Sequence, residues 1–252
     1  MFISNILIQV LFAAAAVAVP TTHSLGGQLA ARTDEASPPH IFDLDYAGAF
    51  ISGQKNEFNQ ITAEFNVPSA KPPAGNPIQS AASAVIGFDR FTNSAFFLVV
   101  GTRIALNRGA TSYTNFYEWT RRDGLVVARG TFPDVNVKAN DELRILVQAT
   151  SATSAVLTLT KNSGEQTQTQ RVSVPGAALN LQEPDWFVRA EGSLPLARIG
   201  DVAYDGAHAT EKSGATVGPL DDRATVVNIR RGDVTVTETD LGGESVTIRF
   251  TQ

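Results

Sequence analysis

The sequence predicts an all-β protein built as a two-sheet antiparallel β-sandwich. From Phe42 onward, short runs of β-branched and aromatic residues are separated by clusters of Gly, Pro, Asn and Asp, which is the pattern of strands joined by turns. The runs recur about every ten residues, as the strands of a sandwich or barrel do. No segment repeats its apolar residues at the roughly 3.6-residue period of an amphipathic helix.

About a dozen runs qualify as strands on their β-branched and aromatic content. The expected strands are 61–67, 84–88, 96–104, 113–119, 143–149, 155–160, 166–174, 186–190, 197–202, 225–229, 234–239 and 246–250.

The side-chain pattern of individual runs predicts which faces are covered. Polar residues recur at every second position over parts of 143–148 and 155–160, so each of these strands has one solvent-facing side. Residues 95–100 are apolar on both faces, which predicts a strand covered on both sides. The runs 233–239 and 245–250, separated by Gly242-Gly243, predict a C-terminal hairpin.

Composition narrows the class of function. The 252 residues are 43% hydrophobic and 18% charged, which is typical of a globular domain. A net charge of −5 argues against nucleic acid and anionic membranes as partners. The absence of Cys excludes disulfides, thiolate nucleophiles and iron–sulfur clusters, and three scattered His give no metal site, so no cofactor is expected. At acid pH the 20 basic residues would repel one another, which favours a working pH nearer neutral.

The N-terminus predicts a secreted protein. The apolar run 6–19 ends in Ala16-Val17-Ala18, a small-x-small pattern typical of signal peptidase sites, so we expect 1–18 to be a signal peptide. The run is too short for a membrane span of about twenty residues. Residues 19–42 are polar and rich in turn formers, which indicates a pro-segment or flexible linker. We therefore expect one β-sandwich domain over 43–252 and an extracellular monomer.

Three segments, 87–89, 113–119 and 183–189, combine aromatic residues with carboxylates. The aromatic side chains could belong to the core while the carboxylates lie at solvated strand edges. Alternatively, both could line a cleft. The segments by themselves leave the two interpretations open.

Six segments match family patterns in order, wholly or in part. Five are 44–49 (S-N-W-A-G-A), 62–68 (T-x-x-F-x-V-P), 85–90 (W-V-G-I-D-G-D), 112–119 (S-Y-x-A-W-Y-E-W) and 184–190 (A-E-W-I-V-E-D). The sixth, 216–225 together with 237–239, resembles the C-terminal end of the family. In these patterns the chain resembles the glutamic peptidases, or eqolisins, which are secreted fungal acid endopeptidases. The resemblance covers about residues 44–252. It implies the jelly-roll sandwich shared with concanavalin A-like lectins and glucanases.

The resemblance also implies a catalytic dyad, in which a Glu activates water and a Gln amide donates to the developing oxyanion. The Gln position, ten residues after Asp89, falls on Val99, and the Glu position, three residues after Trp186, falls on Arg189. Val has no donor, and Arg stays protonated and cannot act as a base. We therefore expect a catalytically impaired pseudo-peptidase, and Glu118 or Glu191 is the substitute base if activity persists.

Two further expectations concern the cleft. A guanidinium at position 189 needs a partner, so we expect Glu118 and Asp89 near Arg189, with at least one paired to it. The cleft would bind a peptide or a glycan, and a lectin-like protein would stack sugars on aromatic rings, here Tyr46, Phe116, Trp119 and Trp186. The expected cleft residues are Tyr46, Asp89, Phe116, Glu118, Trp119, Asp185 and Trp186.

Overall fold

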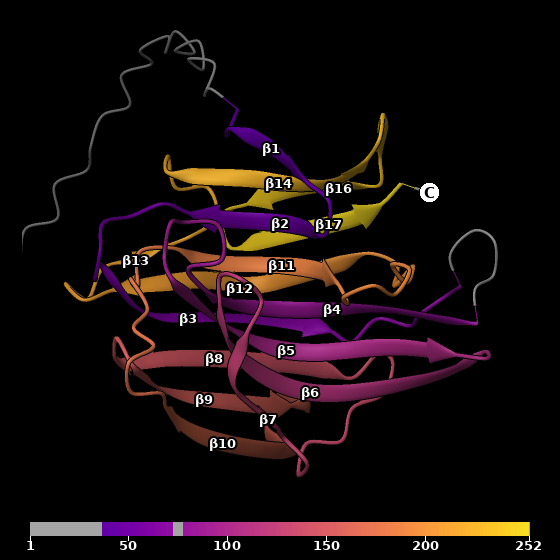
Figure 1. Ribbon diagram of the computed structural model, residues 1–252, viewed down its shortest axis with the longest axis horizontal. Coiled ribbons are helices and arrows are strands. Elements are labelled where there is room, and N and C mark those ends of the chain that lie inside the picture. Colours follow the sequence, from indigo (N-terminus) through magenta and orange to yellow (C-terminus); the bar gives the residue numbers. More distant parts are fainter. Residues whose placement is uncertain (1–36, 73–77, 252) are drawn as a thin grey trace, which may run out of the picture. The chain divides into compact units, whose positions relative to one another are not determined.

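A computed structural model describes residues 37–72 and 78–251, and these form two stacked β-sheets (Figure 1). The only helical element among them is the 3₁₀ turn η1 (Asn162–Gly164). The described residues contain no helix long and apolar enough to cross a membrane. The predicted signal peptide and most of the predicted pro-segment lie outside the described residues, and β1 begins three positions before residue 43.

The first sheet has the strand order β1-β14-β2-β11-β4-β5-β6-β7, and β15 pairs with β14. Neighbouring strands are antiparallel except β1 and β14, which are parallel. The bounds are β1 His40–Asp43, β2 Tyr46–Ile51, β4 Gln79–Phe88, β5 Phe96–Asn107, β6 Ala110–Arg121, β7 Val126–Thr131, β11 Pro184–Ala190, β14 Ala224–Arg231 and β15 Val234–Thr235.

The second sheet has the order β10-β9-β8-β3-β12-β17-β16, and β13 pairs with β12. Its strands are β3 Phe58–Asn66, β8 Glu142–Ser151, β9 Ser154–Lys161, β10 Gln166–Ser173, β12 Val202–Glu211, β13 Thr216–Val217, β16 Thr237–Gly242 and β17 Ser245–Phe250. The predicted two-sheet sandwich is confirmed, as is the hairpin, which is β16–β17.

Two expected strands are placed wrongly. Residues 197–201 are not a strand, and β12 instead runs from Val202 to Glu211. The run 234–239 is divided between β15 and β16. In β12, polar residues and a register shift between Asp205 and His208 interrupt the apolar pattern, so its local signal is too weak to predict the strand.

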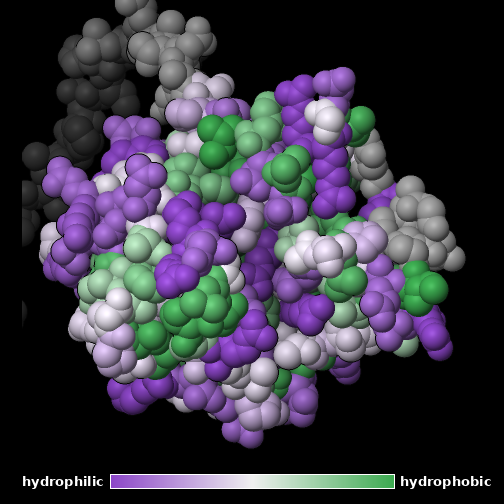
Figure 2. Space-filling view, in the orientation of Figure 1, coloured by the Kyte–Doolittle hydropathy of each residue, from purple (hydrophilic) through white to green (hydrophobic). Residues whose placement is uncertain are grey.

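The core between the sheets holds the largest aromatic side chains, whereas the face of the molecule in Figure 2 mixes hydrophilic and hydrophobic residues. Trp119, Trp186 and Tyr204 are fully buried there. The Trp186 indole donates to the carbonyl of Thr62 at 3.1 Å, and the Tyr204 hydroxyl donates to the carbonyl of Phe187 at 2.7 Å, so each ties one sheet to the other. Neither tryptophan lines a cleft, which corrects the prediction from the sequence.

Alternation along β6 explains this outcome. Successive side chains of a strand point to opposite faces, so Trp119 enters the core and Glu118 and Phe116 point outward. The strand β5 is covered on both sides, as predicted, because Leu98 and Val100 face the core while Phe97 and Val99 join a separate cluster on the outer face.

Candidate functional site

Strand register brings the two dyad positions onto the outer face of the first sheet. Val99 on β5 lies opposite Gly87 on β4 and Glu118 on β6. Arg189 on β11 lies opposite Ser83 on β4. These pairings place the two positions at different levels along the strands, with Phe116 and Glu118 between them.

Val99 lies in an apolar cluster. It is fully buried and packs with Val85, Phe97, Phe116 and Phe187. None of these side chains can donate a hydrogen bond. The position that the resemblance assigns to an oxyanion donor is therefore a sealed hydrophobic contact.

The loop between β4 and β5 covers this cluster. The Phe91 ring stacks on Phe50 at 5.0 Å between centroids and meets Tyr46 and Phe187 edge-on at 5.8 and 5.9 Å. The guanidinium of Arg90 lies 3.9 Å from the centroid of the Tyr46 ring. Together these side chains close the outer face at the end of the sheet that carries Val99.

The loop is held in place by a second guanidinium. Arg122 donates to the backbone carbonyls of Ser94 at 2.9 Å, Arg90 at 3.1 Å and Asp89 at 3.3 Å. It also donates to the carbonyl of Thr92. A side chain with several fixed donors is suited to fasten a loop in this way.

Arg189 sits in ion pairs, as its sequence position predicted. Its Nη2 donates to Glu118 Oε2 at 2.7 Å and its Nε donates to Glu191 Oε1 at 2.9 Å. The ring of Phe116 lies 5.1 Å from the guanidinium carbon. Burial opposes the charge, but Glu191 and Glu118 hold the pKa of Arg189 above its ordinary value.

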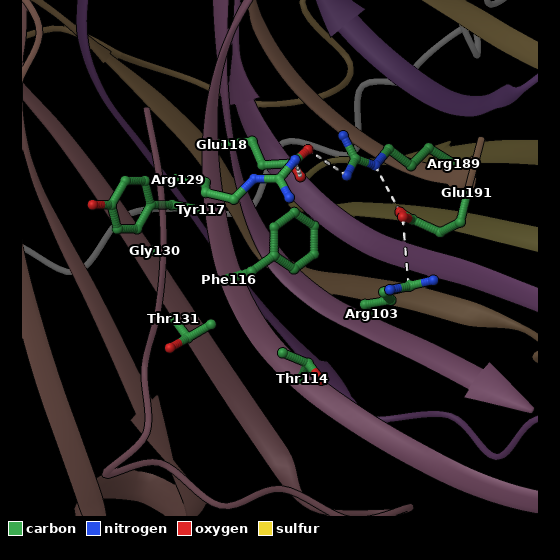
Figure 3. Close-up of a pocket in the computed structure, with 10 residues that line it drawn as sticks. All are labelled: Arg103, Thr114, Phe116, Tyr117, Glu118, Arg129, Gly130, Thr131, Arg189 and Glu191. Atoms are coloured by element: carbon green, nitrogen blue, oxygen red, sulfur yellow. Dashed lines mark hydrogen bonds and ion pairs between the residues drawn. The ribbon is translucent and has the colours of Figure 1, made fainter. Parts of the chain in front are cut away.

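Two further arginines complete a chain of alternating charge, shown in Figure 3. Arg129 lies 3.4 Å from Glu118, and Arg103 lies 3.6 Å from Glu191. A pocket of about 260 Å³ opens beside this chain. We call it the arginine pocket, and it is lined by Arg103, Thr114, Phe116, Tyr117, Glu118, Arg129, Gly130, Thr131, Arg189 and Glu191.

A second group of carboxyl groups, here called the acid cluster, consists of Asp89, Glu183 and Asp185. All three are buried. Asp89 accepts from the backbone N–H groups of Leu181 at 2.8 Å and Gln182 at 3.1 Å. The sequence had predicted Asp89 near Arg189, and this prediction is wrong because Asp89 accepts from the backbone of Leu181 and Gln182 instead.

Backbone N–H groups also serve the other two members of the acid cluster. Glu183 accepts from Phe91 N, and Asp185 Oδ2 accepts from Arg90 N at 3.2 Å. Asp185 Oδ1 has no hydrogen-bond partner among the described residues. Burial raises the pKa of all three carboxyl groups, that of Glu183 to about 8, and the backbone N–H groups offset this only in part.

The predicted site residues therefore separate into four places. Phe116, Glu118 and Glu191 line the arginine pocket, and Tyr46 is half-buried beneath Arg90. Asp89 and Asp185 are buried in the acid cluster, and Trp119 and Trp186 are in the core.

Sequence reasoning missed Arg103 and Arg129. Arg103 follows Val99 by an even number of positions, so alternation along the predicted strand could have placed both on one face. Arg129 lies on β7, a short strand containing Gly130 that the sequence pattern did not indicate. Within residues 37–72 and 78–251, no group of three or more His, Cys, Asp or Glu side chains could hold a metal ion.

Comparison with known proteins identifies relatives over nearly the whole chain. Residues 45–250 match the Peptidase A4 family. Aspergillopepsin-2 of Aspergillus niger is 29% identical over 98% of this chain and 99% of its own length. The crystal structure of aspergilloglutamic peptidase from Aspergillus niger is 30% identical, with a TM-score of 0.60, over 68% of this chain and 99% of that one.

Scytalido-glutamic peptidase, solved with a transition state analog inhibitor, is 22% identical with a TM-score of 0.69, over 83% of this chain and 99% of that one. A member of the eqolisin family, SCP-B, solved in complex with the tripeptide Ala-Ile-His, is 21% identical with a TM-score of 0.65 and the same coverage of both chains. At these identities the two structures show the fold alone.

Proposed function

The chain belongs to the Peptidase A4 family, and we propose that it keeps the fold of that family as a catalytically impaired protein that binds peptides. The observation that carries the proposal is the state of the two dyad positions. Val99 is sealed in an apolar cluster, and Arg189 is a guanidinium bound to two carboxylates.

The chemistry of amide hydrolysis explains why these two substitutions matter. Attack by water needs a base to accept its proton and a donor to stabilise the oxyanion of the tetrahedral intermediate. Arg189 cannot accept a proton, and Val99 cannot donate a hydrogen bond. Loss of one oxyanion donor alone costs about a hundredfold to a thousandfold in rate.

A displaced carboxylate is the alternative route to activity. Glu191 Oε1 accepts from Ser83 Oγ and from Arg189 Nε, while Oε2 faces Arg103 at 3.6 Å. Glu118 is likewise placed between Arg189 and Arg129. Both candidate bases are thus committed to guanidinium partners, which favours the impaired protein over the active one.

Burial of the two tryptophans disfavours the lectin-like alternative. A sugar-stacking surface needs exposed aromatic rings, but Trp119 and Trp186 are fully buried. Tyr46 is covered by Arg90, which leaves Phe116 at the floor of the arginine pocket. A peptide is therefore the ligand class that we propose.

Secretion is part of the proposal. It rests on the signal-peptide pattern of 1–18 and on the similarity to fungal aspergillopepsin-2. Sequencing the N-terminus of the protein recovered from the culture medium tests it, because a mature chain should begin after residue 18.

Incubation with a denatured protein substrate from about pH 2 to pH 7 tests the loss of activity, because such a substrate presents every peptide bond. We expect no cleavage, with an active family peptidase at equal concentration as the positive control. Cleavage that Glu191→Gln abolishes and that does not depend on Val99 would establish the displaced-carboxylate peptidase instead.

A further inference from the structure

The charge chain of the arginine pocket begins and ends with a guanidinium. Its order is Arg129, Glu118, Arg189, Glu191 and Arg103, as Figure 3 shows. Each carboxylate is therefore shared between two arginines, and three positive charges face two negative ones. The pocket carries one positive charge in excess.

The central and outer arginines differ in solvent exposure and in the lengths of their contacts to carboxylates. The side chain of Arg189 is 10% exposed and its contacts are 2.7 and 2.9 Å. The side chains of Arg103 and Arg129 are 43% and 67% exposed, and their nearest carboxylate oxygens are 3.6 and 3.4 Å away. The two outer arginines thus keep N–H groups for a ligand.

The pocket between them suits a small anion attached to a larger apolar body. Its volume is about 260 Å³, and its lining includes the aromatic residue Phe116 and the polar residues Thr114 and Thr131. A single excess positive charge matches a monoanion, whereas Glu118 and Glu191 would repel a dianion such as phosphate. A guanidinium binds a carboxylate through two parallel hydrogen bonds.

We propose that the arginine pocket binds a carboxylate of a peptide, either an acidic side chain or the C-terminal group. Arg103 and Arg129 supply the contacts, and Phe116 packs against the neighbouring apolar part of the ligand. This inference rests on the proposed function, because it names the class of peptide that the impaired protein binds.

Three dye-labelled hexapeptides that differ in one group each provide the test. The first has Asp at an internal position and an amidated C-terminus, the second has Asn in its place, and the third has Asn and a free C-terminal carboxylate. We expect the purified protein to bind one of the two carboxylate peptides about tenfold or more tightly than the Asn amide. Fluorescence anisotropy at about 20 mM and 200 mM salt measures this, and the preference should shrink as salt rises.

Substitutions in the arginine pocket test whether the preference for a carboxylate peptide arises there. Arg103→Gln and Arg129→Gln should each reduce it to about threefold or less, because each removes a guanidinium. Arg144→Gln is the matched control, since Arg144 is also exposed and lies 3.5 Å from Glu64, but on the second sheet. The control should keep the full preference.

The outcomes separate this inference from the proposed function. Equal binding of all three peptides, or equal loss of preference in Arg144→Gln, overturns the carboxylate site and leaves peptide binding intact. No binding of any peptide overturns both. Preferential binding of a carboxylate peptide that is also cleaved upholds the site and overturns the catalytic impairment.

Discussion

The first sheet and its adjoining loops carry two groups of carboxyl groups that are stabilised in opposite ways. In the arginine pocket, Glu118 and Glu191 lie within hydrogen-bond distance of Arg189. In the acid cluster, the carboxyl groups receive backbone N–H groups, and burial raises their pKa values. One group is neutralised by guanidinium partners, whereas burial favours the protonated form of the other.

The contrast shows that burial alone does not decide the state of a carboxyl group. Glu183 and Glu191 are both shielded from solvent, but Glu191 pairs with Arg189 and Glu183 only accepts from Phe91 N. A guanidinium supplies a full positive charge, whereas a backbone N–H supplies a partial one. The pocket is therefore suited to neutral pH and the acid cluster to acid pH.

This result qualifies the expectation from composition. Repulsion among the basic residues favours neutral pH, but the acid cluster binds protons more tightly when folded than when unfolded. The unfolded chain releases its protons near the ordinary pKa of about 4. Between that pH and about 8, the pKa of Glu183 in the folded protein, stability should fall as pH rises.

The largest expected effect comes from removing the guanidinium that distinguishes the pocket from the acid cluster. Arg189→Met leaves Glu118 and Glu191 partly buried without their central partner, which should reduce the free energy of unfolding by about 3 kcal/mol at neutral pH. The loss should shrink at about pH 4, where carboxylates take up protons. Urea denaturation at both pH values measures it.

Arg144→Met is the control for this substitution, because its exposed pair with Glu64 is worth about 1 kcal/mol or less. Equal losses for the two variants would contradict the central role of Arg189. A loss for Arg189→Met that does not depend on pH would show that packing, not charge, is responsible.

A change in the pH dependence of stability is expected when the acid cluster loses one ionisable group. Glu183→Gln keeps an oxygen acceptor for Phe91 N and cannot ionise, so stability should fall less steeply between about pH 5 and pH 8. Each unit of pKa difference corresponds to about 1.4 kcal/mol. Thermal unfolding across this range measures the slope, with the exposed Glu244→Gln as control. An unchanged slope in Glu183→Gln would refute the raised pKa of Glu183 as its cause.

Most of the fold could be predicted from local sequence patterns, because tertiary contacts did not override them. Alternation in 143–148 and the doubly apolar run 95–100 predicted the burial of β8 and β5. Short strands such as β7 could not be predicted, because a few residues around Gly130 show no clear hydrophobic periodicity. Parallel pairing of β1 with β14 depends on chain segments far apart in sequence and has no local signal.

The site was predictable only where chemistry demanded a partner. A buried guanidinium at position 189 required a carboxylate, and Glu118 meets that need. The cover that Phe91 forms over Val99 depends on the path of a loop. Aromatic residues next to acids did not reveal whether they face core or cleft, because a shift of one residue reverses the face.

Restoring half of the family dyad should cost stability without giving activity. Val99→Gln places an amide among aromatic and aliphatic side chains, which should destabilise the protein by about 1–3 kcal/mol. Cleavage of a denatured protein should stay at background, since base and oxyanion donor act as a unit. The same holds for Arg189→Glu alone.

Val99→Leu is the control for Val99→Gln, since it adds comparable bulk without a polar group and so isolates the effect of overpacking. A Gln variant as stable as the Leu variant would mean that the amide finds a partner in this cluster. Cleavage by either single variant would contradict the requirement for both halves of the dyad.

The smallest effect is expected at the outer end of the charge chain. Arg129 shares Glu118 with Arg189, but its side chain is 67% exposed and its contact is 3.4 Å, against 10% and 2.7 Å for Arg189. Exposed ion pairs contribute about 1 kcal/mol or less, because solvent screens the charges and the side chain loses entropy when it is held. Arg129→Gln should therefore shift the urea midpoint far less than Arg189→Met, although both remove a guanidinium from the same carboxylate. A loss comparable to that of Arg189→Met would show that the chain of charges acts as one cooperative unit, and exposure would then not separate its outer arginines from its central one.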